Sequence, residues 1–248
     1  MQFQEQNSYE IKSAIEKSKV AILPVGAVEA HGPHLPLGTD NYLAEEVSKK
    51  LADSIDGMVL PTLPYGQVWS LSDFPGSLTI SNQTITHFIV EIGESLFHQG
   101  FRIMVIVNGH YGNSVALKEA SRVLYEKYPK LKVFVMFYPG TKEVIHDVRE
   151  SQPIHDSYFH ACELETSYML YLAEDKVRMD RAIHDSPDIP DTADVTPTKW
   201  STFSKTAVLG DATLASKEKG EKIISVALRN MTQMIEQAKD EIDCKQND

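Results

Sequence analysis

Apolar and polar residues follow one another along this chain in two alternating patterns. Residues 20–25 (VAILPV) and 102–107 (RIMVIV) are nearly continuous apolar runs, which is typical of strands covered on both faces. Residues 132–138 (KVFVMFY) form a third run of this kind. A fourth, around residue 60, is interrupted by two prolines and is therefore expected to be short. The chain is thus predicted to contain several buried strands.

The segments between these runs have apolar residues at helical spacing. Ser81 and Gly100 stand where the N-terminal cap and the C-terminal stop of one helix are expected, and Asp40 stands at the N-terminal edge of another. Further helices are predicted from Ser114 and over residues 215–239. The apolar positions of the three longest segments are Leu43, Val47, Leu51 and Ile55; Ile85, Phe88, Ile89, Ile92 and Leu96; and Ile224, Leu228, Met231 and Ile235.

Strands that alternate with crossover helices predict an α/β fold, a three-layer α/β/α sandwich with a mostly parallel central sheet. No repeat or linker divides the sequence, so residues 1–248 are expected to form one domain. The least regular stretch, residues 180–210, is expected to be a long loop over the site or at a subunit contact. In such folds ligands bind at the carboxyl ends of the strands.

Composition excludes several classes of protein. The formal net charge of −11 argues against a nucleic-acid partner, which would require a basic surface. Two cysteines are too few for a disulfide framework, which favours a cytoplasmic location. No apolar run is long enough to span a membrane, and the first residues lack the apolar core of a signal peptide. The acidic stretch 185–194 (DSPDIPDTAD) is predicted to be a solvated loop.

Metal-binding residue types follow the first strand in EAHGPHLPLGTD. Glu29 and His31 are two residues apart, so their side chains point to the same side of an extended segment. Asp40 follows at a helix start. Carboxylate oxygen and imidazole nitrogen are the ligands of zinc, manganese or ferrous iron. Each residue taken alone is better explained as a turn histidine or a helix cap, whereas the group in one stiff loop favours a metal site.

Two further clusters strengthen this interpretation. His110 follows the strand at residues 102–107 in NGHYGN, although a lone histidine is more often structural than a ligand. The third cluster, HDSYFHACELETS, holds His155, Asp156, His160, Glu163 and Glu165. If this segment is helical from residue 162, Glu165 and Glu163 point in different directions, so both cannot easily reach one metal.

Other chemistries have weaker support. The chain has neither the G-x-S-x-G motif of serine hydrolases nor a phosphate-binding P-loop. Cys162 is close to His160, but neighbours in sequence rarely align as nucleophile and base, so a buried structural cysteine is expected. Trp69 and Trp200 are candidates either for stacking on a substrate ring or for covering the core.

Five stretches of the sequence resemble the creatininase (creatinine amidohydrolase) family: LPVGAVEAHGPHLPLGTD, DFPGSLTI, VNGHYGN, HACELETS and VLGDATLASKEKGE. The resemblance implies an α/β/α sandwich, two divalent metal ions, usually a homohexamer, and hydrolysis of a cyclic amide or a formamide. It also implies that His160 is catalytic and that four residues are metal ligands, with Asp40 bridging the two ions. The implied ligands are Glu29, His31, Asp40 and His110.

Two positions depart from the family pattern. Creatininases have a ligating glutamate where this chain has Gly112, and a tryptophan that closes over creatinine where this chain has Asp156. Creatinine is therefore not the expected substrate. Four protein ligands are few for two metals, so Glu165 is predicted to be a fifth, with Glu163 as the alternative. A glutamate introduced at position 112 is expected to replace Glu165 in part.

The sequence as a whole predicts a metal-dependent amidohydrolase. Its dinuclear centre would hold Zn²⁺, Mn²⁺ or Fe²⁺ and would act on the C–N bond of a small amide. One alternative is a non-catalytic metal-binding or assembly protein that retains an enzyme shell. Another is a metal-dependent phosphoesterase, although none of the three clusters contains the Arg or Lys that would hold a phosphate.

Overall fold

The core of the protein is a four-stranded parallel sheet. The computed structural model describes residues 1–156 and 158–244. Its strands are β1 (Val20–Val25), β2 (Met58–Val59), β3 (Ile103–Asn108) and β4 (Lys132–Met136), in the spatial order β2-β1-β3-β4. Every neighbouring pair is parallel. The predicted α/β fold with a mostly parallel sheet is confirmed.

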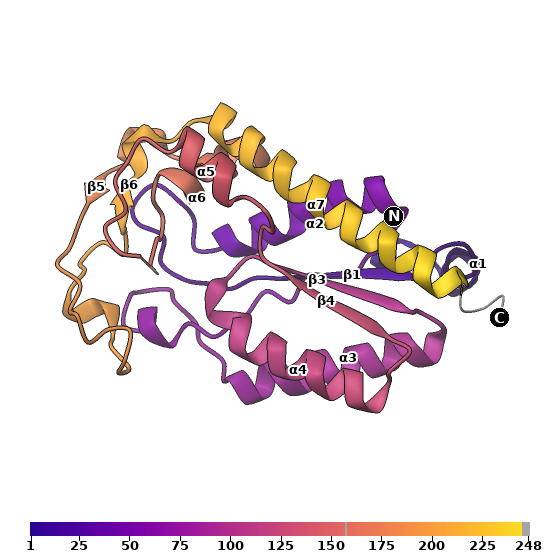
Figure 1. Ribbon diagram of the computed structural model, residues 1–248. Coiled ribbons are helices and arrows are strands. Elements are labelled where there is room, and N and C mark those ends of the chain that lie inside the picture. Colours follow the sequence, from indigo (N-terminus) through magenta and orange to yellow (C-terminus); the bar gives the residue numbers. More distant parts are fainter. Residues whose placement is uncertain (157, 245–248) are drawn as a thin grey trace.

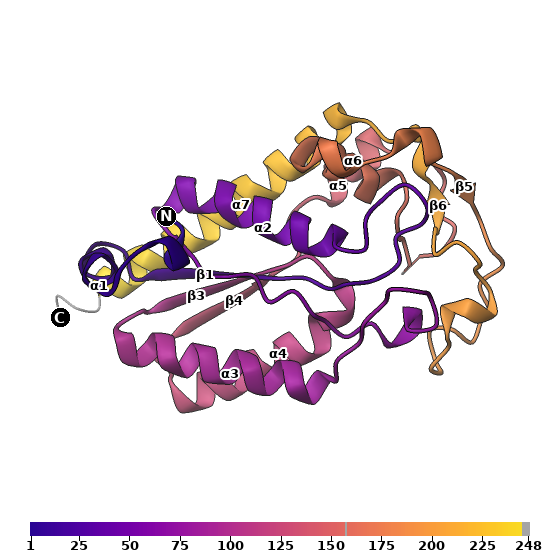
Figure 2. The ribbon, with the colours of Figure 1, turned by 180° about the vertical axis from the view of Figure 1, so that it is seen from behind.

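Helices cover both faces of the sheet, which gives the three predicted layers (Figures 1 and 2). One layer contains α2 (Thr39–Ile55), α6 (Glu163–Leu172) and α7 (Lys217–Cys244). The opposite layer contains α3 (Asn82–Gln99) and α4 (Ser114–Lys127). Two shorter helices are α1 (Ser8–Lys17) and α5 (Lys142–Val148).

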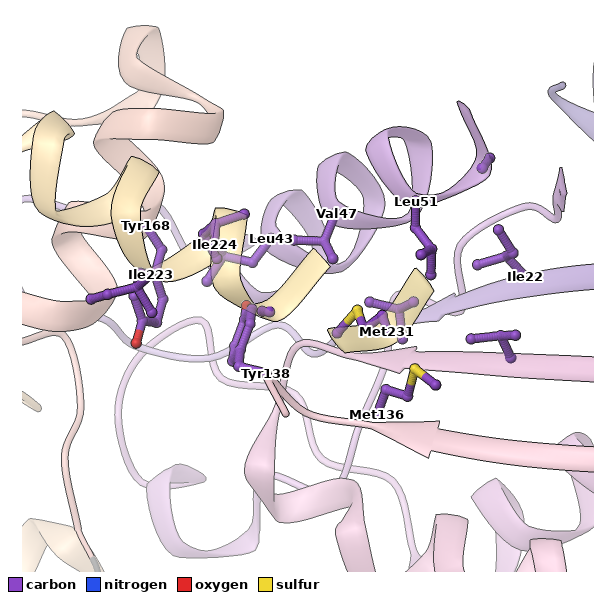
Figure 3. Close-up of a cluster of buried hydrophobic side chains, with 14 of the residues drawn as sticks. Ile22, Leu43, Val47, Leu51, Met136, Tyr138, Tyr168, Ile223, Ile224 and Met231 are labelled. Atoms are coloured by element: carbon purple, nitrogen blue, oxygen red, sulfur yellow. The ribbon is translucent and has the colours of Figure 1, made fainter. Parts of the chain in front are cut away.

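Alternate side chains of the buried strands pack against opposite helix layers. In β1, Ile22 packs with the cluster that includes α2 and α7, whereas Leu23 packs with the cluster of α3 and α4. The same alternation in β3 sends Val105 to the first cluster and Ile106 to the second, because successive side chains of a strand point to opposite faces. Figure 3 shows the first cluster, where Leu43, Val47 and Leu51 of α2 lie beside Ile223, Ile224 and Met231 of α7.

Some elements differ from the sequence-based expectation. The last helix was expected over residues 215–239, but it begins at Lys217 and runs to Cys244. Helices α1 and α5 were not predicted, because α1 buries only Ile11 and α5 buries no residue. Such helices lack a long apolar stripe, which is the main signal of a helix in a sequence.

The loops at the carboxyl ends of the strands lie together, at the end of the sheet away from the N-terminus and from the last turns of α7 (Figure 1). The irregular segment expected at residues 180–210 lies there and is bounded by a short antiparallel pair, β5 (His184–Asp185) and β6 (Gly210–Asp211). Among the described residues, no helix has the length and apolar character needed to cross a bilayer.

Candidate metal centre

The loop after β1 carries the first candidate ligands into the protein interior. Glu29 and His31 are 2% and 1% exposed. The loop is held by backbone contacts, since the Glu29 amide donates to the Leu37 carbonyl at 3.0 Å. Asp40 is 1% exposed and lies in the first turn of α2. It is not the helix cap, because Gly38 occupies that position, so its carboxylate is free to point into the site.

The loop after β3 supplies His110. Its Nε2 donates to the carbonyl of Gln67 at 2.8 Å, which fixes the ring. Asn113 holds that carbonyl in place from behind, since its Oδ1 accepts from the Gln67 amide at 2.9 Å and its Nδ2 donates to the Gly26 carbonyl at 3.0 Å. Asn108 accepts from the amide of His110 at 3.2 Å. Both asparagines therefore help to position His110.

The start of α6 supplies Glu165 and, just before it, His160. Ala161 has a φ of 47°, a left-handed conformation that is uncommon for residues other than glycine. This turn aims its amide at Oε2 of Glu165, at 2.7 Å. Nε2 of His160 donates to the carbonyl of Ala30 at 2.8 Å. This hydrogen bond connects the segment that holds His160 to the loop after β1.

These side chains converge on two neighbouring positions that share Asp40. On one side, Nδ1 of His110 lies 3.1 Å from Oε1 of Glu29 and 3.2 Å from Oδ2 of Asp40. On the other side, Nε2 of His31 lies 3.3 Å from Oδ1 of Asp40 and 3.5 Å from Oε2 of Glu165. Each trio has ligand atoms close enough together to hold one ion. A third group, Glu29, His31 and His160, also meets this condition, so the cluster can hold a cation in more than one place.

The hydrogen bonds around the site leave its facing atoms without partners. His31 and His110 each direct one ring nitrogen at a backbone carbonyl, of Glu29 and of Gln67, so that nitrogen carries the proton of the neutral ring. The other nitrogen then turns a lone pair toward carboxylates. Among the described residues, Oε2 of Glu29, Nε2 of His31 and Oδ2 of Asp40 are buried atoms with no hydrogen-bond partner. Buried lone pairs that face one another repel, and cations between them remove that cost.

Electrostatics point to the same demand for positive charge. Burial alone would lower the pKa of His31, but the carboxylates of Asp40 and Glu165 raise it well above its usual value. Burial would likewise lower the pKa of His110, but the carboxylates of Glu29 and Asp40 raise it well above its usual value. Burial would raise the pKa of Asp40, yet the two histidines hold it far below its usual range. Protons can meet this demand, and divalent metal ions can meet it as well.

Other candidates from the sequence lie outside the two trios. Glu163 points away: its carboxylate accepts from the amides of Glu150 and Ser151 at 3.0 and 2.8 Å and pairs with Lys219. Nε2 of His34 is 2.9 Å from Oγ1 of Thr166, behind the site. The ring is neutral there, because burial and the neighbouring His31 lower its pKa to about 4.

His155 and Cys162 also lie apart from the cluster. His155 faces Asp194, with 3.6 Å between Nε2 and Oδ2. Cys162 is completely buried, and burial raises the pKa of its thiol to about 11. A protonated, buried thiol is inert, which agrees with the structural role expected for this cysteine.

Gly112 lies so close to the ring of His110 that no side chain fits at this position. A Cβ atom at this glycine would lie 2.4 Å from Nε2 of His110 and 2.5 Å from the carbonyl oxygen of Gln67. Both distances are too short for non-bonded atoms. A glutamate at position 112 would therefore break the hydrogen bond that orients His110, and the expectation that it could replace Glu165 is wrong for this backbone.

A cavity of about 530 Å³ opens above the cluster. Glu29, Asp40, His110, His160 and Glu165 form its floor. Its walls come from five segments of the chain and include residues that the sequence did not single out. The aromatic wall residues are Trp69, Tyr111, Phe137, Tyr158, Phe159 and Trp200. The volume is typical of a small-molecule site. Both tryptophans thus line the cavity.

The site is of the type found in α/β metal-dependent hydrolases. It combines a parallel sheet, a buried carboxylate–histidine cluster at the carboxyl end of that sheet and a cavity above the cluster. A family model described as creatininase, creatinine amidohydrolase, matches residues 4–235. The chain therefore belongs to the creatininase family, whose members are metal-dependent hydrolases acting on carbon–nitrogen bonds.

Individual relatives differ in what they act on. Creatinine amidohydrolase of Pseudomonas putida is 32% identical over 87% of this chain and 88% of its own length. A mycofactocin precursor peptide peptidase of Mycolicibacterium smegmatis is also 32% identical, over 83% of this chain and 80% of its own. Mutant creatininase in a zinc–zinc form superimposes with a TM-score of 0.86 at 29% identity, covering 96% of this chain and 97% of its own. A manganese form of creatininase superimposes with a TM-score of 0.85 at 31% identity, covering 96% of this chain and 98% of its own.

Proposed function

We propose that this protein hydrolyses a cyclic amide or formamide C–N bond of a small molecule at a centre of two divalent metal ions. The observation that carries the proposal is the placement of Asp40, whose two carboxylate oxygens face His31 and His110 separately. One carboxylate between two ligand sets is the arrangement that a bridged metal pair requires. Zinc, manganese and ferrous iron fit these nitrogen and oxygen donors, and zinc and manganese occur in the related structures.

The proposed ligands are Glu29, Asp40 and His110 for one ion and His31, Asp40 and Glu165 for the other. Glu165 then takes the place left open by Gly112. Two such ions would polarise the scissile carbonyl and lower the pKa of water. The carbonyls of Glu29 and Gln67 hold the histidines in the tautomer that presents a lone pair to a metal.

His160 is proposed to move a proton at Nδ1. Its Nε2–H is held by the Ala30 carbonyl, so only Nδ1 is free to accept or return a proton. That atom lies 3.8 Å from Oε1 of Glu29 and 3.9 Å from Oε2 of Glu165, at the floor of the cavity. Trp200 packs its ring edge-on to the imidazole at a centroid distance of 5.3 Å, which limits the ring's movement. These contacts favour a proton-transfer role beside the metals.

The two alternatives are less well supported. A phosphoesterase needs cations for its phosphate, and the described cavity lining contains no lysine or arginine. A non-catalytic protein would have no need of a cavity that opens onto the cluster. A cytoplasmic location and a homohexamer of the 27.8 kDa chain remain proposals that rest on composition and on the family resemblance. Light scattering of the purified protein would test the hexamer.

Hydrolysis assays of the metal-loaded protein test the function directly. The panel contains cyclic amides, formamides, short peptides and phosphate monoesters, each with added Zn²⁺, Mn²⁺ or Fe²⁺. We expect turnover of a member of the first two groups, lost on chelation and in Asp40→Asn. Turnover of phosphate esters alone would support the phosphoesterase, and metal binding without any turnover would support the non-catalytic protein.

A further inference from the structure

We propose that the cavity selects a substrate whose outer part is a flat, positively charged group, and that Asp156 is the residue that determines this selectivity. The proposal rests on the proposed function, because it assumes that the substrate occupies the space above the candidate metal centre. It adds a class of substrate that the chemistry of amide hydrolysis does not by itself imply.

The charges around the cavity are the first argument. Of its acidic lining residues, Glu29, Asp40 and Glu165 belong to the floor, where they face the histidines and the proposed metal ions. Asp156 is the acidic lining residue of the wall, and it is exposed to solvent. Within the described part of the chain, no hydrogen bond or ion pair occupies its carboxylate. Its charge is therefore available to a ligand.

Lys199, a candidate for an opposing charge, contacts other groups. It lies between the lining residues Thr198 and Trp200 but does not itself line the cavity. Its Nζ donates to the carbonyl of Trp69 at 2.7 Å, contacts Ser72, and lies 3.6 Å from Oδ1 of Asp73. The same Nζ lies over the ring of Trp69, 4.5 Å from its centroid, so the Lys199 charge is already engaged by these groups. Among the described lining residues, a substrate carboxylate would therefore find no lysine or arginine to pair with.

The aromatic walls are the second, independent argument. Several of these side chains are exposed although they are large and apolar: Tyr111 is 70%, Trp69 39% and Phe159 37% exposed. A continuous series of ring contacts leads inward from His155 through Tyr158 and Trp200 to His160, with centroid distances of 4.5, 5.9 and 5.3 Å. Aromatic faces bind flat cations such as amidinium and guanidinium groups more strongly than neutral groups of the same shape. Walls of this kind beside one free carboxylate suit a delocalised cation.

A matched set of flat probes tests the selectivity without requiring turnover. Benzamidinium, benzamide and benzenesulfonate share one ring and carry positive, neutral and negative charge. Trp69 and Trp200 are the two tryptophans of the chain and both line the cavity, so quenching of intrinsic fluorescence reports binding at this site. We expect the metal-loaded protein to bind benzamidinium most tightly and benzenesulfonate most weakly.

Variants of Asp156 identify the residue responsible. In Asp156→Asn, binding of benzamidinium should weaken about three- to tenfold and binding of benzamide by less than about twofold, as expected for one partly solvated charge contact with cation–π support. Asp156→Lys should reverse the order in favour of benzenesulfonate. Asp188→Asn removes the same charge from an exposed position that does not line the cavity, and it should change neither affinity.

The outcomes separate this proposal from the proposed function. Equal weakening of benzamidinium and benzamide in Asp156→Asn, or tightest binding of benzenesulfonate by the unmodified protein, would overturn the charge selectivity even if amides are hydrolysed. Failure of every amide to turn over, together with the expected probe order, would overturn the proposed reaction and leave the cation selectivity of the cavity in place.

Discussion

Oδ2 of Asp40 lies 3.2 Å from Nδ1 of His110, and in the neutral ring neither atom has a proton to share. The proton of that ring is on Nε2, where the Gln67 carbonyl accepts it. A close approach of two lone pairs in the interior is stable only when a positive charge lies between them. The relationship makes Asp40 the most informative residue to change.

Asp40→Asn should abolish binding of both metal ions, because one carboxylate serves both ligand trios. Elemental analysis of the purified protein should find close to two divalent ions per chain before the change and close to none after it. Asp53→Asn, an exposed change on the same helix, is the matched control and should keep both. Retention of two ions by Asp40→Asn would exclude the bridging assignment.

His160→Ala should retain the metals and the fold and lose most of its activity. Removing a general acid–base group typically lowers kcat by about 10²–10⁴-fold. His146→Ala, at an exposed position on α5, should leave kcat unchanged. Loss of metal along with activity in His160→Ala would make His160 a ligand, together with Glu29 and His31, whose ligand atoms lie close to its own.

Creatinine should be a poor substrate. Asp156 lines the cavity where creatininases have a tryptophan that closes over the ring, and a carboxylate cannot stack on a flat neutral heterocycle. Steady-state assays of the metal-loaded protein should show turnover far below that of the amide found in the panel. A KM for creatinine below about 1 mM with an ordinary enzymatic kcat would contradict this.

Much of the fold and part of the site could be predicted because their signals lie in residue type and spacing. Strands β1 and β3 are buried along their whole length, so their apolar runs are continuous. Glu29, His31 and Asp40 could be singled out because chemically distinctive side chains share one short loop.

The features of the site that could not be predicted depend on backbone groups, which every residue has. The histidines of the site are oriented by backbone carbonyls, such as those of Gln67 and Ala30, and these leave no mark in the sequence. The steric conflict at Gly112 is likewise a property of the path of the backbone. The aromatic walls come from loops with no periodic pattern, so their assembly around one cavity becomes visible only in three dimensions.

Cys162 should not react with thiol reagents in the folded protein. Its pKa of about 11 leaves roughly one thiol in a thousand ionised at pH 8, and the residue is completely buried. Ellman's reagent should therefore label only the exposed Cys244 quickly, and both thiols after denaturation. Cys162→Ala should keep its hydrolytic activity. Rapid labelling of Cys162, with loss of activity in the alanine variant, would revive the cysteine nucleophile.

Changing Glu165 and Glu163 separately tests which of the two is the ligand. Glu165→Gln should weaken binding of one ion and leave the other near full occupancy, because Glu165 belongs to only one trio. Glu163→Gln should keep both ions. It should instead lower the free energy of unfolding at pH 7 by about 1–3 kcal/mol, the usual range for losing hydrogen bonds to a buried charged group. Metal titrations and denaturant unfolding separate the two outcomes.

The pH dependence of the Glu163 effect provides a further check. Burial would raise the pKa of Glu163, but Lys219 and the amides of Glu150 and Ser151 lower it below its ordinary value. Because the pKa of Glu163 is lower in the folded protein, its ionised carboxylate stabilises the fold at pH values above the unfolded-state pKa. That stabilisation is lost as the pH falls through the folded-state pKa. The stability difference between Glu163→Gln and the unmodified protein should thus be largest near neutral pH and shrink below about pH 4. If instead Glu163→Gln lost one metal and Glu165→Gln lost none, the ligand assignment of the two glutamates would be reversed.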